Sequence, residues 1–164
     1  MKTKFLLSTM IITIAFASCK KGDTGPAGPN GATGATGNAN VQSLTFNIDS
    51  TQWVADSAGL QWGATYTLPA ATNVSGGVFL YVQDDNNWAA LPHVDYGITL
   101  EFNYDPATKI VEVQSADARA SVMIPNPPSM TFKVVIIPPA IARQNPNVNM
   151  GNYREVKAAF NLSN

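Results

Sequence analysis

Histidine and cysteine, which carry much of the nucleophilic and transition-metal chemistry of proteins, occur once each in this 164-residue chain. The histidine, His93, stands between Pro92 and Val94, where a loop meets a predicted strand. A general base needs a nucleophile within hydrogen-bond reach, and the chain has no GxSxG, HExxH or phosphate-loop motif. We therefore interpret His93 as a surface or capping residue, and we expect no catalytic residue, no metal site and no cofactor.

Carboxylates offer two further kinds of chemistry. The run Asp84-Asp85-Asn86-Asn87 has hard oxygen ligands suited to calcium, but the spacing of an EF-hand loop is absent and a solvated turn is favoured. A glycosidase uses two carboxylates, one as the acid and one as the nucleophile, and the candidates for such a pair across a sheet are Asp56, Asp95, Glu101 and Glu112. Because their spacing singles out no pair, a hydrolase is the least favoured function.

Tryptophans suggest binding rather than catalysis. A flat aromatic ring can stack on the apolar face of a sugar, so Trp88, Trp53 and Trp62 are candidates for a glycan-binding surface. The favoured alternative places all three in the hydrophobic core. Trp88 lies just after an apolar run, among polar neighbours, and is the best candidate for an exposed ring.

The amino terminus carries the pattern of a lipoprotein signal peptide over residues 1–18. Lys2 and Lys4 precede an apolar run, residues 5–17, which is too short to span a bilayer as a helix. The segment Phe16-Ala17-Ser18-Cys19 resembles the bacterial lipobox, with Phe16 where leucine is usual. That resemblance implies acylation of Cys19, and two or more acyl chains hold a protein firmly at a membrane.

Residues 19–40 are predicted to form a tether. From Gly22 the chain has six uninterrupted Gly-X-Y triplets, the repeat of the collagen triple helix. The repeat is short and contains only Pro26 and Pro29, so a flexible spacer is favoured over a stalk that trimerises weakly.

Residues 41–164 are predicted to form one all-β domain, a two-layer antiparallel β-sandwich of Ig-like or jelly-roll-like type. Leu44, Phe46 and Ile48 alternate with polar residues, the period of a half-buried strand. The run 77–82 is apolar throughout and predicts a strand covered on both faces, and the runs 98–104 and 110–113 predict a hairpin. Further strands are expected over 62–68, 132–137 and 153–162, and no amphipathic helix is expected.

Composition limits the partners. The net charge of −1, without a basic patch, gives no electrostatic basis for binding nucleic acid. A single cysteine allows no disulfide within the chain, so the fold depends on burial of its apolar core.

Several segments resemble small collagen-repeat lipoproteins of Bacteroidota, a group without an established activity. The similar segments are residues 37–41 directly after the triplets, 77–81, 131–138 and 153–160. The resemblance implies a lipoprotein of a Gram-negative cell envelope, anchored in the outer membrane. Asp49-Ser50-Thr51 and Asp56-Ser57-Ala58 are similar to the O-glycosylation sequon of Bacteroidota, which makes Ser50 and Ser57 possible modification sites.

The sequence therefore predicts a lipid-anchored envelope protein with a non-catalytic β domain that serves an interaction or structural role. The alternatives are a glycan-binding module and, after it, a carboxylate-pair hydrolase. The expected partners are a membrane, through Cys19, and a glycan or protein ligand.

Overall fold

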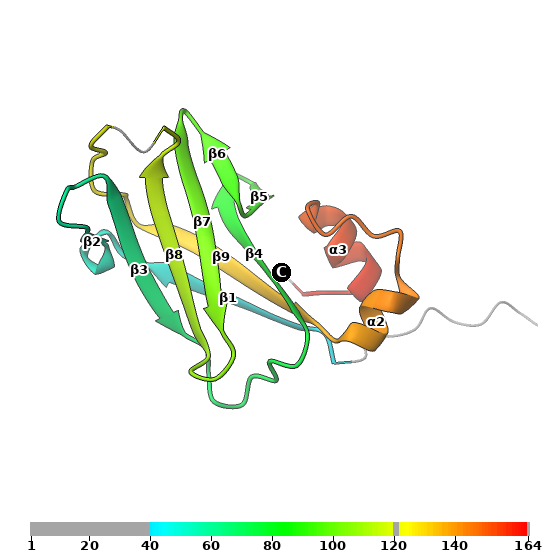
Figure 1. The fold of residues 1–164 in the computed structure, drawn as a ribbon. Coiled ribbons are helices and arrows are strands. Elements are labelled where there is room, and N and C mark those ends of the chain that lie inside the picture. The colour runs from blue at the N-terminus through cyan, green and yellow to red at the C-terminus, as the bar shows by residue number, and fades with distance from the viewer. Residues whose placement is uncertain (1–39, 120–121, 164) are drawn as a thin grey trace, which may run out of the picture. The chain divides into compact units, whose positions relative to one another are not determined.

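The computed structural model describes residues 40–119 and 122–163. The predicted signal peptide, Cys19 and all but the last residue of the predicted tether lie outside the described residues. The described chain forms two antiparallel sheets that pack face to face, with two short α-helices (Figure 1), which confirms the predicted two-layer β-sandwich. The strands are β1 (Gln42–Ile48), β2 (Val54–Ala55), β3 (Gln61–Thr67), β4 (Gly77–Asp84), β5 (Asn87–Ala90), β6 (His93–Asp95), β7 (Ile98–Asp105), β8 (Ile110–Asp117) and β9 (Met130–Ile137), and the helices are the 3₁₀ helix η1 (Ser50–Gln52), α2 (Pro139–Gln144) and α3 (Tyr153–Phe160).

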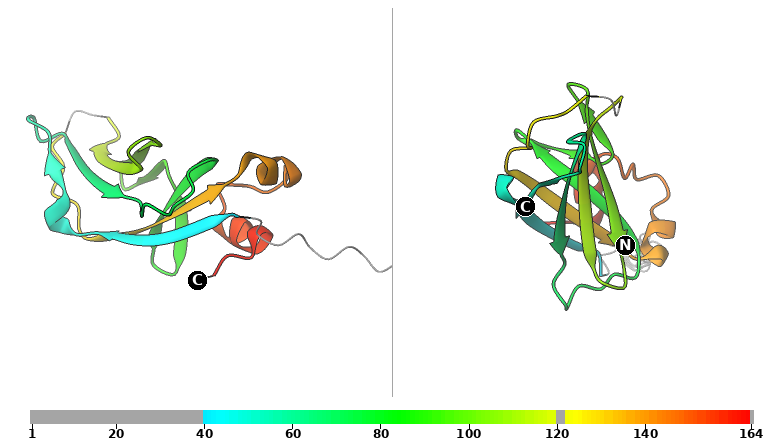
Figure 2. Two further views of the ribbon diagram at one scale, coloured as in Figure 1. Left: turned by 90° about the horizontal axis from the view of Figure 1, so that it is seen from below. Right: turned by 60° about the vertical axis from the view of Figure 1, so that its left-hand side comes forward.

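The strand order explains why β4 and β9 are apolar on both faces. The four-stranded sheet has the order β1-β9-β4-β5 and the five-stranded sheet the order β2-β3-β8-β7-β6. β4 and β9 are the central strands of the first sheet, and Figure 2 shows this sheet between the other sheet and α3. Leu80 of β4 accordingly faces the core between the sheets, and Tyr81 faces the helical side. The prediction that residues 77–82 form a strand covered on both faces is confirmed.

The predicted hairpin is also confirmed. β7 pairs with β8 from Ile98 opposite Asp117 to Asp105 opposite Ile110. The Asp105 carboxylate accepts hydrogen bonds from the Thr108 hydroxyl, at 2.7 Å, and from the Ala107 amide, at 2.8 Å. These bonds lower the pKa of Asp105 and order the turn. The hydrogen bond from the Thr108 side chain has the largest effect on the pKa.

The main core fills the space between the two sheets. Its fully buried members alternate along the strands, as a period of two requires, and include Ile48, Val111, Val113 and Phe132. Phe46 of β1 stacks on Tyr66 of β3 with ring centroids 4.0 Å apart, which joins the sheets through an aromatic pair.

A second apolar cluster covers the outer face of the four-stranded sheet, and here the sequence prediction is wrong. Residues 153–162 are predicted as a strand, but they form α3, an amphipathic helix whose Tyr153, Val156 and Phe160 are buried. Their spacing of three and four residues places them on one side of a helix. Asn152 caps the helix by accepting from the Arg154 amide, and Asn161 ends it in a left-handed conformation with φ of 49°.

The helices of the described chain are short. α2 begins with Pro139, a favoured first helical residue because it needs no amide donor. No helix of residues 40–119 and 122–163 has the length and apolar character needed to cross a membrane.

Candidate functional site

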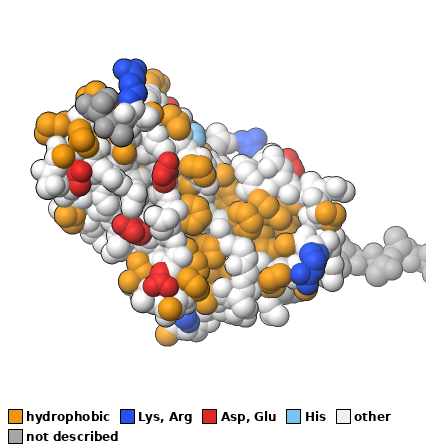
Figure 3. Space-filling model, in the orientation of Figure 1, with side chains coloured by type: hydrophobic (Ala, Val, Ile, Leu, Met, Phe, Trp, Pro, Cys, Tyr) orange, Lys and Arg blue, Asp and Glu red, His pale blue; other side chains and the backbone are white. Residues whose placement is uncertain are grey.

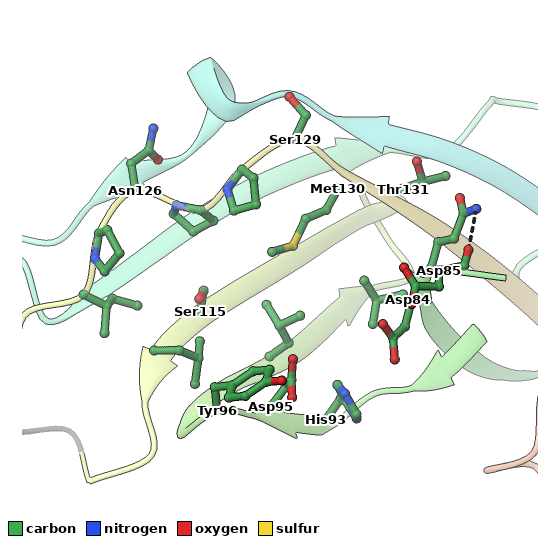
Figure 4. A pocket seen from close by; sticks show the side chains of 18 residues that line it. Asp84, Asp85, His93, Asp95, Tyr96, Ser115, Asn126, Ser129, Met130 and Thr131 are labelled. Carbon is green, nitrogen blue, oxygen red and sulfur yellow. Dashed lines mark hydrogen bonds between the residues drawn. The ribbon is translucent and has the colours of Figure 1, made fainter. Parts of the chain in front are cut away.

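A cavity of about 600 Å³ opens between the two sheets at one end of the sandwich. Its walls come from the ends of β4, β6, β7, β8 and β9 and from the loop 124–129 (Figure 4). Val41, where the chain enters the domain, lies in the cluster under the helices, and Gln42 pairs with Ile136 near the end of β9. Met130 at the start of β9 lines the cavity. The length of β9 therefore separates the cavity from the entry of the chain by about 20 Å.

The cavity forms where the inward-facing residues of both sheets change from apolar to polar. In β4 the inward series Leu80 and Val82 continues to Asp84, and in β8 the series that contains Val113 continues to Ser115. Alternate residues of a strand share a face, so these polar groups occupy positions that would otherwise extend the core. Removal of apolar bulk at the same end of both sheets leaves the space open.

β6 contributes polar residues to the same face. His93 pairs with Leu100 and Asp95 pairs with Ile98, and directly paired residues lie on the same side of an antiparallel sheet. Figure 4 shows His93, Asp95 and Tyr96 along one side of the cavity. Tyr96 is 98 % exposed, so its ring projects from the rim.

The opposite wall is a proline-rich loop held by hydrogen bonds. Pro125, Pro127 and Pro128 fix three backbone φ angles between residues 124 and 129, which limits the freedom of this wall. The backbone of Ser50 in η1 binds the loop twice, because its carbonyl accepts from Asn126 Nδ2 at 2.9 Å and its amide donates to the Ser129 hydroxyl at 3.0 Å.

Trp62 holds the start of the same loop. Its indole Nε1 donates to the Ile124 carbonyl at 3.0 Å, and its ring packs against the main core. Trp62, a predicted sugar-stacking residue, is therefore half-buried and positions the cavity wall.

The mouth of the cavity is acidic. Asp84, Asp85 and Asp95 line it, and no lysine or arginine is among the lining residues of the described chain. Asp85 and Asn86 form the turn between β4 and β5, where Asp84 pairs with Asn87, so the predicted turn is confirmed. Within the described residues no three histidine, cysteine or acidic side chains gather closely enough to hold a metal ion.

Ser115, His93 and Asp95 are residue types of a catalytic triad, but their register keeps them apart. Ser115 and His93 both pair with Leu100, from opposite sides of β7. Two strand spacings, about 10 Å, separate their backbones, whereas a serine and its base must approach to about 3 Å. The arrangement provides a polar lining rather than an activated nucleophile.

Ser115 has an uncommon environment for a hydroxyl. It is 1 % exposed and lines the cavity between apolar neighbours. Its hydroxyl makes no hydrogen bond to any residue of the described chain. Because a buried polar group normally has a partner, this hydroxyl is available to a molecule in the cavity.

The other two predicted glycan-binding residues lie elsewhere. Trp53 is 4 % exposed in the main core and offers no face on which a sugar could stack. Trp88, the best candidate for an exposed ring, is half-buried in the cluster under the helices. The three tryptophans thus form no common surface, and glycan binding through Trp62 and Trp88 stays a prediction.

Trp88 belongs instead to a cage around a buried lysine. Lys133 of β9 is 3 % exposed, and its Nζ lies 4.5 Å from the centroid of Trp88 and 4.9 Å from that of Tyr153. The same Nζ donates to the Tyr153 hydroxyl at 3.1 Å. This contact joins the four-stranded sheet to α3.

The remaining predicted carboxylates lie outside the cavity. Asp56 accepts from the amides of Leu60 and Gln61, at 2.8 and 3.2 Å, and orders the turn between β2 and β3. Glu101 and Glu112 lie on the outer face of the five-stranded sheet, where Figure 3 shows the acidic side chains scattered. Among the four carboxylates considered for a hydrolase, Asp95 alone reaches the cavity.

The two predicted modification sites differ in exposure. Ser57 is exposed in the turn between β2 and β3, whereas Ser50 is half-buried in η1. Modification of either serine stays a prediction.

Sequence reasoning missed Ser115 and the prolines of the loop as site residues. The available signal was the alternation in β8, where the inward positions Val111 and Val113 are followed by a serine at the next inward position. The same break in β4, at Asp84, predicts a solvated turn, with calcium ligation as the less favoured alternative.

Comparison of the chain with protein-family models, curated proteins and solved structures finds no match. The site must therefore be interpreted from its own geometry.

Proposed function

We propose that this chain is a lipid-anchored protein of the bacterial cell envelope, held at the outer membrane, whose β-sandwich is a non-catalytic ligand-binding domain. The observation that carries the binding function is the cavity at the open end of the sandwich. Its volume lies within the range of small-molecule sites, about 300–1,000 Å³, and it combines apolar walls with a few polar groups.

The anchor in this proposal rests on the sequence. Lys2 and Lys4, the short apolar run and the small residues before Cys19 fit a lipoprotein signal. Acyl chains on Cys19 would hold the protein at the bilayer, since each buried methylene group contributes about 0.8 kcal/mol.

The cavity opens at the end of the domain away from Val41, where the predicted β domain begins. The proline-rich wall is fixed before a ligand arrives, which lowers the entropy lost on binding.

The anchor is tested in a bacterium that processes lipoproteins. The wild-type chain should incorporate labelled palmitate and sediment with the outer membrane, and the Cys19→Ser variant should do neither. Palmitate incorporation that persists in Cys19→Ser would contradict the assignment of the anchor.

The binding site is tested with a panel of soluble sugars, alcohols, amines and acids, measured by thermal shift. Ile98→Trp places a large ring in the cavity, whereas Val94→Trp makes a similar addition on the exposed face of the neighbouring strand. We expect stabilisation by at least one compound to be lost in Ile98→Trp and kept in Val94→Trp. If no compound stabilises the wild type, or if both variants respond as the wild type does, the cavity is not the binding site.

A further inference from the structure

We infer that the cavity binds an aliphatic primary amine that carries a neutral polar group at its other end. This inference rests on the proposed function, because it assigns a ligand class to the same cavity. Three independent features of the lining lead to it: the charge at the mouth, the apolar walls and the free hydroxyl inside.

The mouth selects a cation. Asp84, Asp85 and Asp95 lie at the ends of β4 and β6, and within the described residues His93 is the only basic side chain of the lining. An anionic ligand would meet like charges, whereas an ammonium group can donate three hydrogen bonds to carboxylates.

The walls select an aliphatic body. Leu100 and Ile98 from β7, Met130 from β9 and Ile124 from the loop line the interior. Among the residues that the structure describes, Tyr96 is the only one with a phenyl or indole ring in the lining, and its side chain projects at the rim. The described part of the interior therefore offers no flat platform for a sugar ring. A methylene chain gains from burial against such walls in proportion to its area.

The interior selects a neutral polar group at the far end. Ser115 is buried without a hydrogen-bond partner in the described chain, and a hydroxyl on the ligand can donate to it or accept from it. A second charge at this depth would be costly, because no opposite charge lies beside Ser115 among the lining residues.

The register sets the length of the ligand. Ser115 is two strands from Asp95 and two residues farther from the mouth. Strand geometry then separates the Cα atoms of Ser115 and Asp95 by about 12 Å. Both side chains extend into the cavity and shorten the gap between their polar atoms, so a chain of about six carbon atoms bridges it.

The probe is 6-aminohexan-1-ol, titrated into the full chain in non-ionic detergent and followed by amide chemical shifts. Matched compounds are hexane-1,6-diol, which lacks the charge, and 6-hydroxyhexanoate, which reverses it. We expect the amine to bind with a dissociation constant of about 1 mM, as suits so small a ligand, and the other two about tenfold more weakly or worse. The shifts should centre on the ends of β6, β7 and β8.

Two variants with the same change of charge serve as test and control. Asp95→Asn removes a carboxylate at the mouth, and we expect it to weaken binding of the amine about tenfold. Glu101→Gln removes an exposed carboxylate from the outer face of the sheet and should leave binding unchanged within twofold. Equal effects of both variants would mean that overall charge, not the mouth, attracts the amine, and would overturn the inference.

The outcomes separate the ligand class from the proposed function. If the diol or the acid binds as tightly as the amine, with shifts at Leu100 and Ser115, the ligand class is wrong and the cavity remains a binding site. If the amine binds and the chemical shifts change only outside the cavity, the ligand class and the assignment of the cavity as the binding site are both wrong. If none of the three compounds binds, the ligand class is wrong, and the panel with Ile98→Trp decides the proposed function independently.

Discussion

The buried Lys133 allows a quantitative test of how α3 is attached to the sandwich. Lys133 is 3 % exposed, and its Nζ donates to the Tyr153 hydroxyl and lies over the rings of Tyr153 and Trp88. Tyr153→Phe removes the hydroxyl and keeps the ring. A hydrogen bond to a charged group contributes about 1.5–3 kcal/mol, and water cannot easily replace a partner that is 5 % exposed.

We therefore expect Tyr153→Phe to lower the free energy of unfolding by about 2 kcal/mol, which lowers the melting temperature by about 8 °C for a domain of this size. Lys133→Met removes the buried charge while it keeps a long side chain between the rings. Removal of a buried charge is favourable, but the Tyr153 hydroxyl loses the lysine as its partner, so this variant should lose about 1 kcal/mol.

The double variant Lys133→Met/Tyr153→Phe gives the decisive comparison. Without the ammonium group, loss of the hydroxyl should cost little, so the two changes should show a coupling of about 1.5 kcal/mol. Equilibrium urea denaturation of the full chain in non-ionic detergent measures all four free energies. If Tyr153→Phe costs the same in both backgrounds, the hydroxyl does not stabilise the lysine and the reasoning is refuted.

Two further predictions concern the backbone and the cavity wall. Gly76→Ala should lower the free energy of unfolding by about 2 kcal/mol or more, because the added Cβ would lie 2.4 Å from the Ile137 carbonyl oxygen. Gly97→Ala should lower it by only about 1 kcal/mol, because Gly97 has a φ of +80° but open space around it. Equal losses in chemical denaturation would contradict the steric argument. Trp62→Phe should speed amide exchange in residues 122–129 by about fivefold, because it removes the hydrogen bond to the loop. Trp53→Phe is the control, because its Nε1 has no partner in the described chain, and it should leave exchange in that segment unchanged. Faster exchange in both variants would mean that general loosening of the core is the cause.

The sequence alone determined the class of the fold and most of its strands. Alternation such as Leu44, Phe46 and Ile48 is a local property, because the period of a strand is two residues wherever it packs. The same local logic identified the hairpin of β7 and β8 and the turn at Asp85, whose composition favours a reversal of the chain. The lipobox pattern around Cys19 is equally local, and the assignment it supports stays a prediction.

The local pattern did not predict the correct secondary structure for residues 153–162. Tyr153, Val156 and Phe160 fit one face of a helix, but the continuing run to Leu162 also resembles a short apolar strand. The helical form is favoured once Asn152 caps it and the outer face of β4 and β9 offers an apolar surface to cover. That surface exists only after the four-stranded sheet has assembled, so a single segment could not reveal it.

The cavity was decided by tertiary structure alone. The sequence pattern predicts Asp84 as a turn residue, His93 as a surface residue and Asp95 as a carboxylate without a partner. No local pattern places these three residues near Ser115. They meet because β4 pairs with β9 in one sheet while β6 and β8 pair with β7 in the other, and the packing of the sheets brings both polar ends together. Strand register fixes which residues face inward. It depends on pairing between segments distant in the sequence, so the residue types and spacing of one segment do not reveal it.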